Sequence, residues 1–253
     1  MGSKIMKGAE PIFYKKGKIG CLLCHGFTGT PDEFREVAEY LSDKGISVIV
    51  PRLPGHGTNL EELIKTKNED WYSEYKKAYQ QLTSFCKEIF ICGLSMGGLL
   101  TLKFAAENSV KGIITISTPM KFKFAQNLLL ACLSGLFKNY AVKKSKAELA
   151  EKVKYNNISY DKYPISPANS VRKLVNQVKN ELNKITAPIL ILQSSLDKKW
   201  IVNSSKIIYN SISSKDKQLI YLENSPHCLT IGPERDKAKK LIYEFIKIRS
   251  SQK

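Results

Sequence analysis

The sequence predicts an α/β fold: a mostly parallel, doubly wound sheet with an inserted helical cap. Short apolar segments alternate with longer amphipathic ones along most of the 253 residues, as is typical of strands joined by crossover helices. The alternation breaks once, between Thr118 and Ala187, and this stretch is too long for an ordinary connection. We therefore expect one domain over residues 1–253, with a cap inserted at about 119–186.

The strands and helices follow from local patterns. Segments that are nearly continuously apolar or rich in β-branched residues predict buried parallel strands at 18–24, 46–50, 88–92, 112–117, 188–193 and 217–222. Amphipathic stretches predict helices at 32–44, 69–86, 96–108, 203–211 and 233–248. The first of these starts with Pro31 and carries Asp32 and Glu33 in its first turn, a typical helix beginning. No strong strand is expected between Thr118 and Ala187.

The charge balance does not predict a nucleic-acid-binding protein. Lys and Arg exceed Asp and Glu by 40 to 23, which gives a net charge of +17, and such an excess can attract polyanions. The lysines are spread along the chain, however, and the densest cluster, at 138–154, is typical of a solvated helix face. We expect no nucleic-acid partner and at most weak contact with anionic membrane surfaces.

The sequence favours a cytoplasmic protein. The N-terminal residues lack the apolar core of a secretory signal. The most apolar stretch, 128–137, is about half of the ~20 residues that span a bilayer. The expected oligomeric state is a monomer or a homodimer.

Cys21 and Cys24 form a CxxC pair, which in some proteins binds metal or performs redox chemistry. The pair lies inside a predicted buried strand, and the chain has no second CxxC. We therefore interpret both as small core residues in a reducing compartment. The sequence predicts neither a metal site nor a cofactor.

Ser95 is the predicted nucleophile. The segment Gly93-Leu-Ser-Met-Gly97 directly follows a predicted strand and precedes a predicted helix. A sharp strand-to-helix turn needs small residues two positions before and two after its apex, and it lifts the apical serine out of the sheet edge. The helix N-terminus behind the serine also favours an anion.

The predicted general base is His227, one of three histidines in the chain. It follows the last predicted strand, where a histidine can reach Ser95 at the carboxyl edge of the sheet. His25 directly follows the first predicted strand, and His56 lies in a Gly/Pro-rich turn. Both are interpreted as structural residues.

Asp197 is the predicted acid that orients this base. In an α/β fold with this serine turn, the order along the chain is nucleophile, acid, histidine. Asp161, Asp197, Asp216 and Glu223 are the alternatives between Ser95 and His227. Asp161 lies in the predicted cap, and Asp216 precedes its strand, at the wrong edge of the sheet. Glu223 has a plausible position but is close to the histidine in the same loop. Asp197 comes four residues after strand 188–193, at the correct edge.

Two backbone amides are predicted to form an oxyanion hole. One belongs to Met96, directly after the nucleophile, and the other to Phe27, in the loop that Gly26 allows to turn tightly. Substitution of either side chain would therefore report on the acyl pocket and not on the donor itself. Phe27 as an ordinary packed aromatic residue is the alternative.

Several segments resemble a known family: LLCHGFTGTPDEF (22–34), PRLPGHGT (51–58), GLSMGGLL (93–100), LDKKW (196–200) and SPHCLT (225–230). Together they resemble the bacterial carboxylesterase and monoacylglycerol lipase branch of the α/β-hydrolases. The resemblance covers about residues 11–249 and is weakest across 120–180. It implies a serine esterase with a small helical cap and no cofactor, with Ser95, Asp197 and His227 as catalytic residues and Phe27 and Met96 as oxyanion donors.

The expected activity is hydrolysis of short- to medium-chain carboxylic esters through an acyl-serine, and the alternative is a monoacylglycerol lipase acting on longer chains. Thioester hydrolysis, acyl transfer and peptide hydrolysis would use the same groups. A haloalkane dehalogenase is disfavoured because it needs an aspartate at position 95. A binding protein without catalysis is disfavoured because all three catalytic residues are present. The apolar stretch 121–137 is either an acyl-binding wall or ordinary core.

Overall fold

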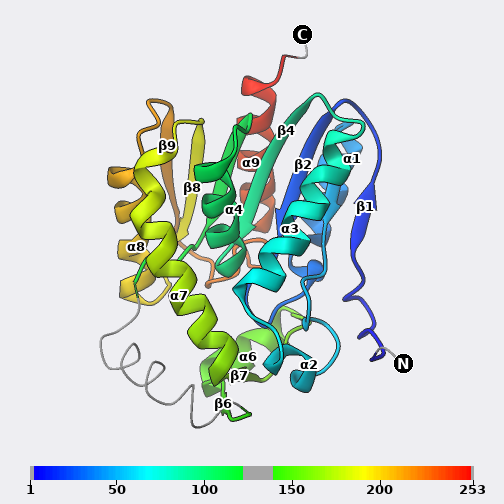
Figure 1. The fold of residues 1–253 in the computed structure, drawn as a ribbon, viewed down its shortest axis with the longest axis vertical. Helices are drawn as coiled ribbons and strands as arrows, with labels where there is room; N and C mark the ends of the chain where they lie inside the picture. The colour runs from blue at the N-terminus through cyan, green and yellow to red at the C-terminus, as the bar shows by residue number, and fades with distance from the viewer. Residues whose placement is uncertain (1–2, 122–138, 252–253) are drawn as a thin grey trace.

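A seven-stranded sheet forms the centre of the protein (Figure 1). The computed structural model describes residues 3–121 and 139–251. Across the sheet, the strands are β1 (Ile12–Tyr14), β3 (Ser47–Val50), β2 (Ile19–Cys24), β4 (Glu88–Leu94), β5 (Gly112–Ile116), β8 (Ile189–Ser194) and β9 (Lys217–Leu222). Strand β1 pairs with β3 in antiparallel orientation, and every other pair is parallel. All six strands predicted from the sequence are present, and β1 is an addition.

The central strands are apolar because both faces of the sheet are covered. Every residue of β2, β3, β5 and β8 is buried, as expected for parallel strands between two helical layers. Two core clusters result, one on each face. Cys21 belongs to one cluster and Cys24 to the other, so these two thiols point to opposite faces and cannot jointly bind a metal ion.

The helices divide between the two core clusters. On one face lie α1 (Arg35–Asp43) and α9 (Arg235–Arg249). The other cluster receives α2 (Leu60–Ile64), α3 (Asn68–Thr83), α4 (Met96–Glu107), α7 (Ile165–Glu181) and α8 (Lys199–Ser211). The predicted helix 32–44 begins as a separate 3-10 turn, η1 (Pro31–Phe34), and the predicted helix 203–211 starts earlier, at Lys199.

Between β5 and β8 the structure corrects one expectation. This insertion contains, besides α7, a short antiparallel ladder of β6 (Ala141–Lys143) and β7 (Lys162–Pro164), together with α6 (Lys146–Lys154) and η2 (Leu182–Lys184). No strong strand was predicted here because three-residue strands on the surface carry no apolar run. The apolar stretch 121–137 falls, except for Lys121, outside the described residues.

The insertion segment 139–164 is attached to the loops of the sheet by specific hydrogen bonds. The Tyr160 hydroxyl donates to the Gly55 carbonyl (2.9 Å) and accepts from the Thr58 amide (2.9 Å). The Tyr160 amide donates to the Thr28 carbonyl (3.0 Å). This segment therefore lies against the loops that follow β2 and β3, as the lower part of Figure 1 also shows.

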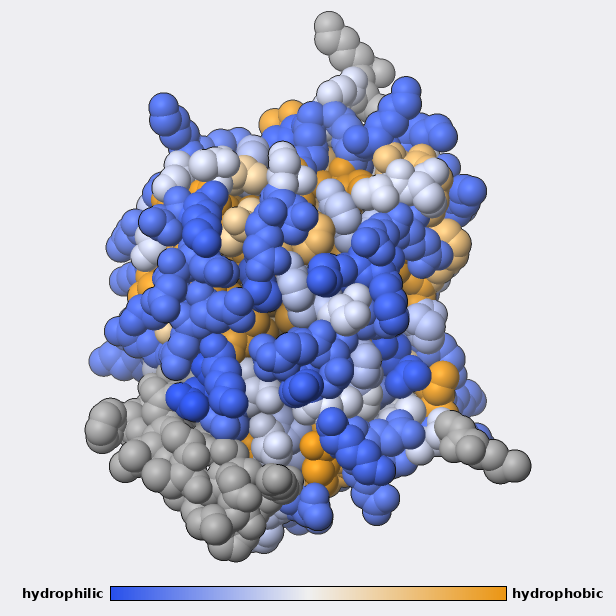
Figure 2. All heavy atoms as spheres, in the orientation of Figure 1, coloured by the Kyte–Doolittle hydropathy of each residue, from blue (hydrophilic) through white to orange (hydrophobic). Residues whose placement is uncertain are grey.

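The face that carries α3, α4 and α7 is dominated by hydrophilic side chains, with apolar ones scattered among them (Figure 2). Within residues 3–121 and 139–251, no helix combines the length and the apolar character needed to cross a bilayer.

Candidate active site

Ser95 lies at a strained turn at the carboxyl end of β4, the central strand of the sheet. It directly follows β4, the fourth of the seven strands, and caps the N-terminus of α4. Its backbone has φ +54° and ψ −114°, a region that costs a non-glycine residue of the order of 1–3 kcal/mol and often marks a functional site. The turn is held by a hydrogen bond from the Ser95 amide to the Ile116 carbonyl (2.8 Å).

The glycines around Ser95 are required by close backbone packing. A Cβ atom on Gly97 would lie 2.0 Å from the Cys24 carbonyl oxygen, and one on Gly93 would lie 2.2 Å from the Gly97 carbonyl oxygen. A Cβ atom on Gly98 would lie 1.9 Å from the Thr118 hydroxyl. Helix α4 therefore starts directly against β2 and β4, and any larger residue would push Ser95 out of this position.

The structure brings Asp197 and His227 together. Asp197 lies in the loop after β8 and His227 in the loop after β9, and their side chains are joined by a 2.5 Å contact from His227 Nδ1 to Asp197 Oδ2. The Asp197 side chain is 3% exposed and the His227 side chain 36% exposed. The carboxylate therefore fixes the Nδ1–H tautomer from the buried side and leaves Nε2 able to accept a proton.

Three charges set the basicity of His227. Burial alone would lower its pKa, but the Asp197 carboxylate, through its charge and its hydrogen bond, and the more distant Glu33 carboxylate outweigh burial and the Lys198 ammonium. The net pKa of His227 is raised above its ordinary value of about 6.5. A histidine of this kind accepts a proton readily near neutral pH.

The other carboxylates considered from the sequence are engaged elsewhere. Asp161 forms an ion pair with Lys152, and Asp216 binds the Arg249 guanidinium through both of its oxygens (2.8 and 2.5 Å). Glu223 is exposed. Among these alternatives, Asp197 is the carboxylate that contacts the histidine.

His25 and His56 are buried and hold loops together. His25 Nδ1 donates to the Gly26 carbonyl (3.0 Å), and its Nε2 accepts from the Leu53 amide (3.2 Å), so the loop after β2 is tied to the loop after β3. His56 Nδ1 donates to the Pro54 carbonyl (3.1 Å). Burial lowers the pKa of His25 to about 4 and that of His56 well below its usual range, so both rings are neutral at pH 7.

Met96 directly follows Ser95, and Phe27 directly follows Gly26, whose Cβ position would lie 3.5 Å from the Ser95 Cβ. Met96 is the first residue of α4, and the amides of a helix's first turn have no partner within the helix. The Phe27 ring stacks on the Tyr163 ring of β7 with 6.1 Å between centroids and 15° between planes, and it also contacts Trp71 (5.8 Å). The sequence did not single out Tyr163, because a tyrosine in a three-residue, partly exposed strand carries no distinguishing signal.

Glu33 is a second residue at this site that the sequence interpretation missed. Its carboxylate is buried and accepts a hydrogen bond from the Gly26 amide (2.8 Å), next to Phe27. The sequence placed it only as an acidic residue of a helix's first turn. No sequence pattern distinguishes it, because its inward direction depends on the 3-10 geometry of η1.

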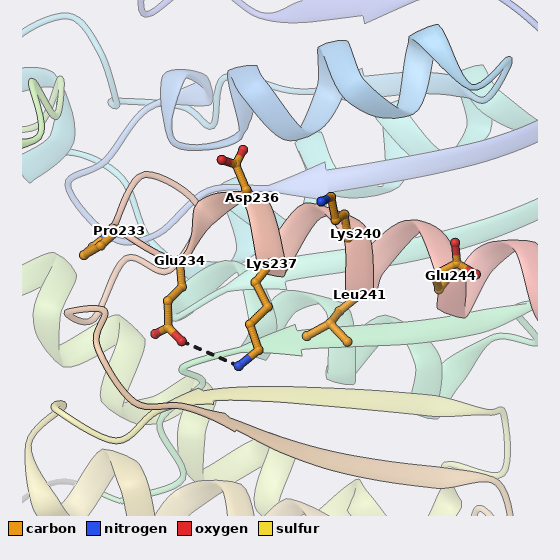
Figure 3. Close-up of a pocket in the computed structure, with 7 residues that line it drawn as sticks. All are labelled: Pro233, Glu234, Asp236, Lys237, Lys240, Leu241 and Glu244. Carbon is orange, nitrogen blue, oxygen red and sulfur yellow. Dashed lines mark ion pairs between the residues drawn. The ribbon is translucent and has the colours of Figure 1, made fainter.

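A separate surface concavity runs along α9 (Figure 3). Its lining residues are Pro233, Glu234, Asp236, Lys237, Lys240, Leu241 and Glu244. Glu234 and Lys237 form an ion pair (3.6 Å) across it. All seven side chains come from one helix and the residues just before it, and none belongs to the Ser95 region. Five of the seven lining residues carry charged side chains.

Comparison with known proteins agrees with this geometry. The family model described as serine aminopeptidase, S33, matches residues 16–234. The chain belongs to this family. It is 33% identical to a carboxylesterase of Bacillus subtilis (strain 168) over 94% of the chain and 96% of the relative. It is also 33% identical to a thermostable monoacylglycerol lipase of Bacillus sp. (strain H-257), over 95% of each.

Solved structures show the same fold. One from work on LipS and LipT, two metagenome-derived lipolytic enzymes, superposes with a TM-score of 0.87 at 28% identity and covers 97% of this chain and 100% of the other. The monoacylglycerol lipase of Paleococcus ferrophilus superposes with a TM-score of 0.81 at 17% identity, over 95% and 99%. The fold is that of the α/β-hydrolases, and the protein is a carboxylic ester hydrolase of the serine hydrolase class.

Proposed function

We propose that the protein hydrolyses short- to medium-chain carboxylic esters, with Ser95 as nucleophile, His227 as general base and Asp197 as the acid that orients it. The observation that carries this proposal is the 2.5 Å contact between Asp197 and His227. It places an oriented, basic imidazole in the loop after β9, while Ser95 rises from the end of β4 at the same edge of a parallel sheet.

The reaction would proceed in two halves. His227 Nε2 takes the Ser95 hydroxyl proton as the serine oxygen attacks the ester carbonyl, and the Phe27 and Met96 amides stabilise the oxyanion. The alcohol leaves with the proton from His227, and an acyl-serine remains. Water, activated by the same imidazole, then releases the carboxylic acid and restores the hydroxyl.

The test is hydrolysis of a p-nitrophenyl ester series from acetate to palmitate. We expect the wild type to turn over the shorter esters best and Ser95→Ala to lose at least about 10⁴-fold in kcat, since removing the nucleophile removes the covalent route. A fluorophosphonate should label the wild type on Ser95 and leave the variant unlabelled. An unlabelled, inactive wild type, or an active Ser95→Ala variant, would refute the proposal.

A monoacylglycerol lipase activity is the second candidate, and the observation that favours it is the equal, 33% identity to the Bacillus monoacylglycerol lipase. Such an enzyme needs room for a long acyl chain. The same ester series separates the candidates, because a lipase of this kind would have its optimum at the long-chain end and would cleave monoacylglycerols faster than p-nitrophenyl butyrate.

We also propose that the protein works in a reducing compartment such as the cytoplasm. The five cysteines in the described part of the chain, among them Cys21 and Cys24, are free thiols, which is usual where disulfides do not persist.

A further inference from the structure

Glu33 is a buried carboxylate beside the predicted nucleophile that the proposed reaction does not use. It belongs to η1 and is 7% exposed. Buried carboxylates need hydrogen bonds or charged partners, and Glu33 Oε2 accepts from the Gly26 amide at 2.8 Å. Gly26 immediately precedes Phe27, so the carboxylate is bonded to the peptide next to the predicted oxyanion donor.

The glycines of this loop leave room for the carboxylate. A Cβ atom on Gly29 would lie 2.2 Å from Glu33 Oε1. A Cβ atom on Gly26 would lie 3.4 Å from Glu33 Oε2 and 3.5 Å from the Ser95 Cβ. Gly26 therefore lies between the Glu33 carboxylate and Ser95, and the carboxylate packs directly against Gly29.

Two charged groups and one amide side chain from other segments act on Glu33. Burial raises its pKa, and the Gly26 amide, the Lys144 ammonium, the imidazolium form of His227 and the Asn157 side chain act in the opposite direction. Lys144 follows β6, and its ammonium lies 5.1 Å from the centre of the Tyr163 ring. The same tyrosine stacks on Phe27. The loop after β2 is therefore contacted by the insertion segment through Phe27 and by the buried Glu33 through Gly26.

We propose that Glu33 is a positioning residue: its carboxylate fixes the Gly26 peptide and so aims the Phe27 amide at the carbonyl oxygen of the bound ester. This inference rests on the proposed function, because it concerns the oxyanion that forms at Ser95. The predicted effect lies in kcat, since the oxyanion exists only in the transition state and not in the bound substrate.

The first test compares a variant that removes the hydrogen-bond acceptor of the Gly26 amide with one that keeps it. Glu33→Ala loses it, and we expect kcat for p-nitrophenyl butyrate to fall about ten- to hundredfold, within the cost of a misplaced or missing oxyanion donor, with KM within twofold of the wild type. Glu33→Gln keeps an oxygen that can accept from the Gly26 amide, and it should retain most of kcat. Rates are normalised to active sites counted with a fluorophosphonate, so partial unfolding does not imitate the effect.

The second test displaces the carboxylate without changing it. Gly29→Ala places a methyl group where Glu33 Oε1 lies, and we expect the same loss in kcat. In the Glu33→Ala background the space is free, so adding Gly29→Ala should cost less than twofold. Such non-additivity is the signature of two residues acting through one contact.

A matched control is Glu36→Gln, the same change one helical turn further along. Glu36 is about half exposed and pairs with Arg235 (3.0 Å) and Lys239 (3.5 Å) on the surface. The Glu36→Gln variant should therefore have the kcat of the wild type.

The outcomes separate the two proposals. A wild type that hydrolyses no ester and is not labelled at Ser95 refutes the proposed function. An active wild type whose Glu33→Ala variant keeps full kcat, whose Glu33→Gln variant loses as much as Glu33→Ala, or whose Gly29→Ala effect is fully additive, overturns the role of Glu33 alone.

Discussion

The loops at the carboxyl edge of the sheet and the insertion segment 139–164 meet at one place but are held in different ways. The loops after β4 and β8 continue from strands whose residues are almost all buried, and the Ser95 amide is bonded to the neighbouring strand. The insertion segment 139–164 has no buried residue in α6. Besides the hydrogen bonds of the buried Tyr160, it is joined to the rest of the protein by side-chain contacts such as Tyr163 on Phe27 and Glu148 with Lys198 (2.9 Å).

This difference suggests a division of labour. Groups fixed by buried backbone keep their geometry whether or not substrate is bound, which suits the reacting atoms. Groups fixed by contacts between partly exposed side chains are easily changed, which suits selection among substrates. We therefore expect substitutions at the sheet edge to act on kcat and substitutions in the insertion segment to act mainly on KM and on chain-length preference.

The largest expected effect tests the sheet edge. Asp197→Asn removes the charge that stabilises the imidazolium and permits the wrong tautomer of His227, so we expect kcat to fall by about 10⁴-fold with little change in KM. Steady-state kinetics with p-nitrophenyl butyrate measure it, and an unchanged unfolding temperature shows that the fold is intact. A loss below tenfold would contradict the assignment of Asp197.

The second prediction concerns pH. Because the pKa of His227 is raised by Asp197 against the effect of burial, and the imidazole must be neutral to accept a proton, kcat/KM should fall about tenfold per pH unit below a midpoint above 6.5. Lys198→Met removes a charge that lowers this pKa, so its midpoint should move to higher pH. A pH–rate profile shows both, and a shift to lower pH in the variant would refute the electrostatic account.

A smaller effect is expected in the insertion segment. Tyr163→Ala removes the ring stacked on Phe27, a contact worth about 0.5–1.5 kcal/mol beyond its buried area, so KM should rise about two- to tenfold while kcat stays within twofold. Tyr163→Phe keeps the ring and loses only the hydroxyl contact to Glu148 (3.3 Å), and it should behave as the wild type. If Tyr163→Ala lowers kcat as much as Asp197→Asn does, the proposed division fails.

The smallest effect should come from the ion pair between the two regions. Lys198 is largely exposed and Glu148 less so, and exposed pairs contribute about 0–1 kcal/mol and weaken with salt. A double-mutant cycle of Glu148→Gln with Lys198→Met, read in KM, should give a coupling of at most about fivefold that disappears in 1 M NaCl. A coupling that survives high salt would show that the contact is not simply electrostatic.

The same contrast explains what could be predicted from sequence. Parallel strands such as 88–94 carry a continuous apolar run because both faces are buried, so their positions were evident. Strand β1 (Ile12–Tyr14) and the β6–β7 ladder have only three residues per strand and are partly exposed, so no periodic pattern marks them. Helix α2 (Leu60–Ile64) is similarly short.

At the site, residues with a fixed place in the chain order could be predicted and residues placed by folding could not. Ser95, Asp197 and His227 each follow a strand that the sequence reveals. Glu33 is directed inward by the 3-10 turn of η1 and by the space beside Gly29, and neither is visible as a pattern. Tyr163 reaches Phe27 only because the insertion folds back over the loop after β2.

The neutral pair of buried histidines, finally, sets a limit on acid tolerance. In the unfolded chain His25 gains a proton as the pH falls through about 6.5, whereas in the folded protein burial delays this to about pH 4. The unfolded state therefore binds more protons across this interval, and folding stability declines with acidity. The His56 pKa is lowered in the same direction by burial and by His25. The His25 and His56 rings, which hydrogen-bond the loops after β2 and β3 at neutral pH, thus lower the free energy of unfolding in acid. This effect is independent of the protonation of His227.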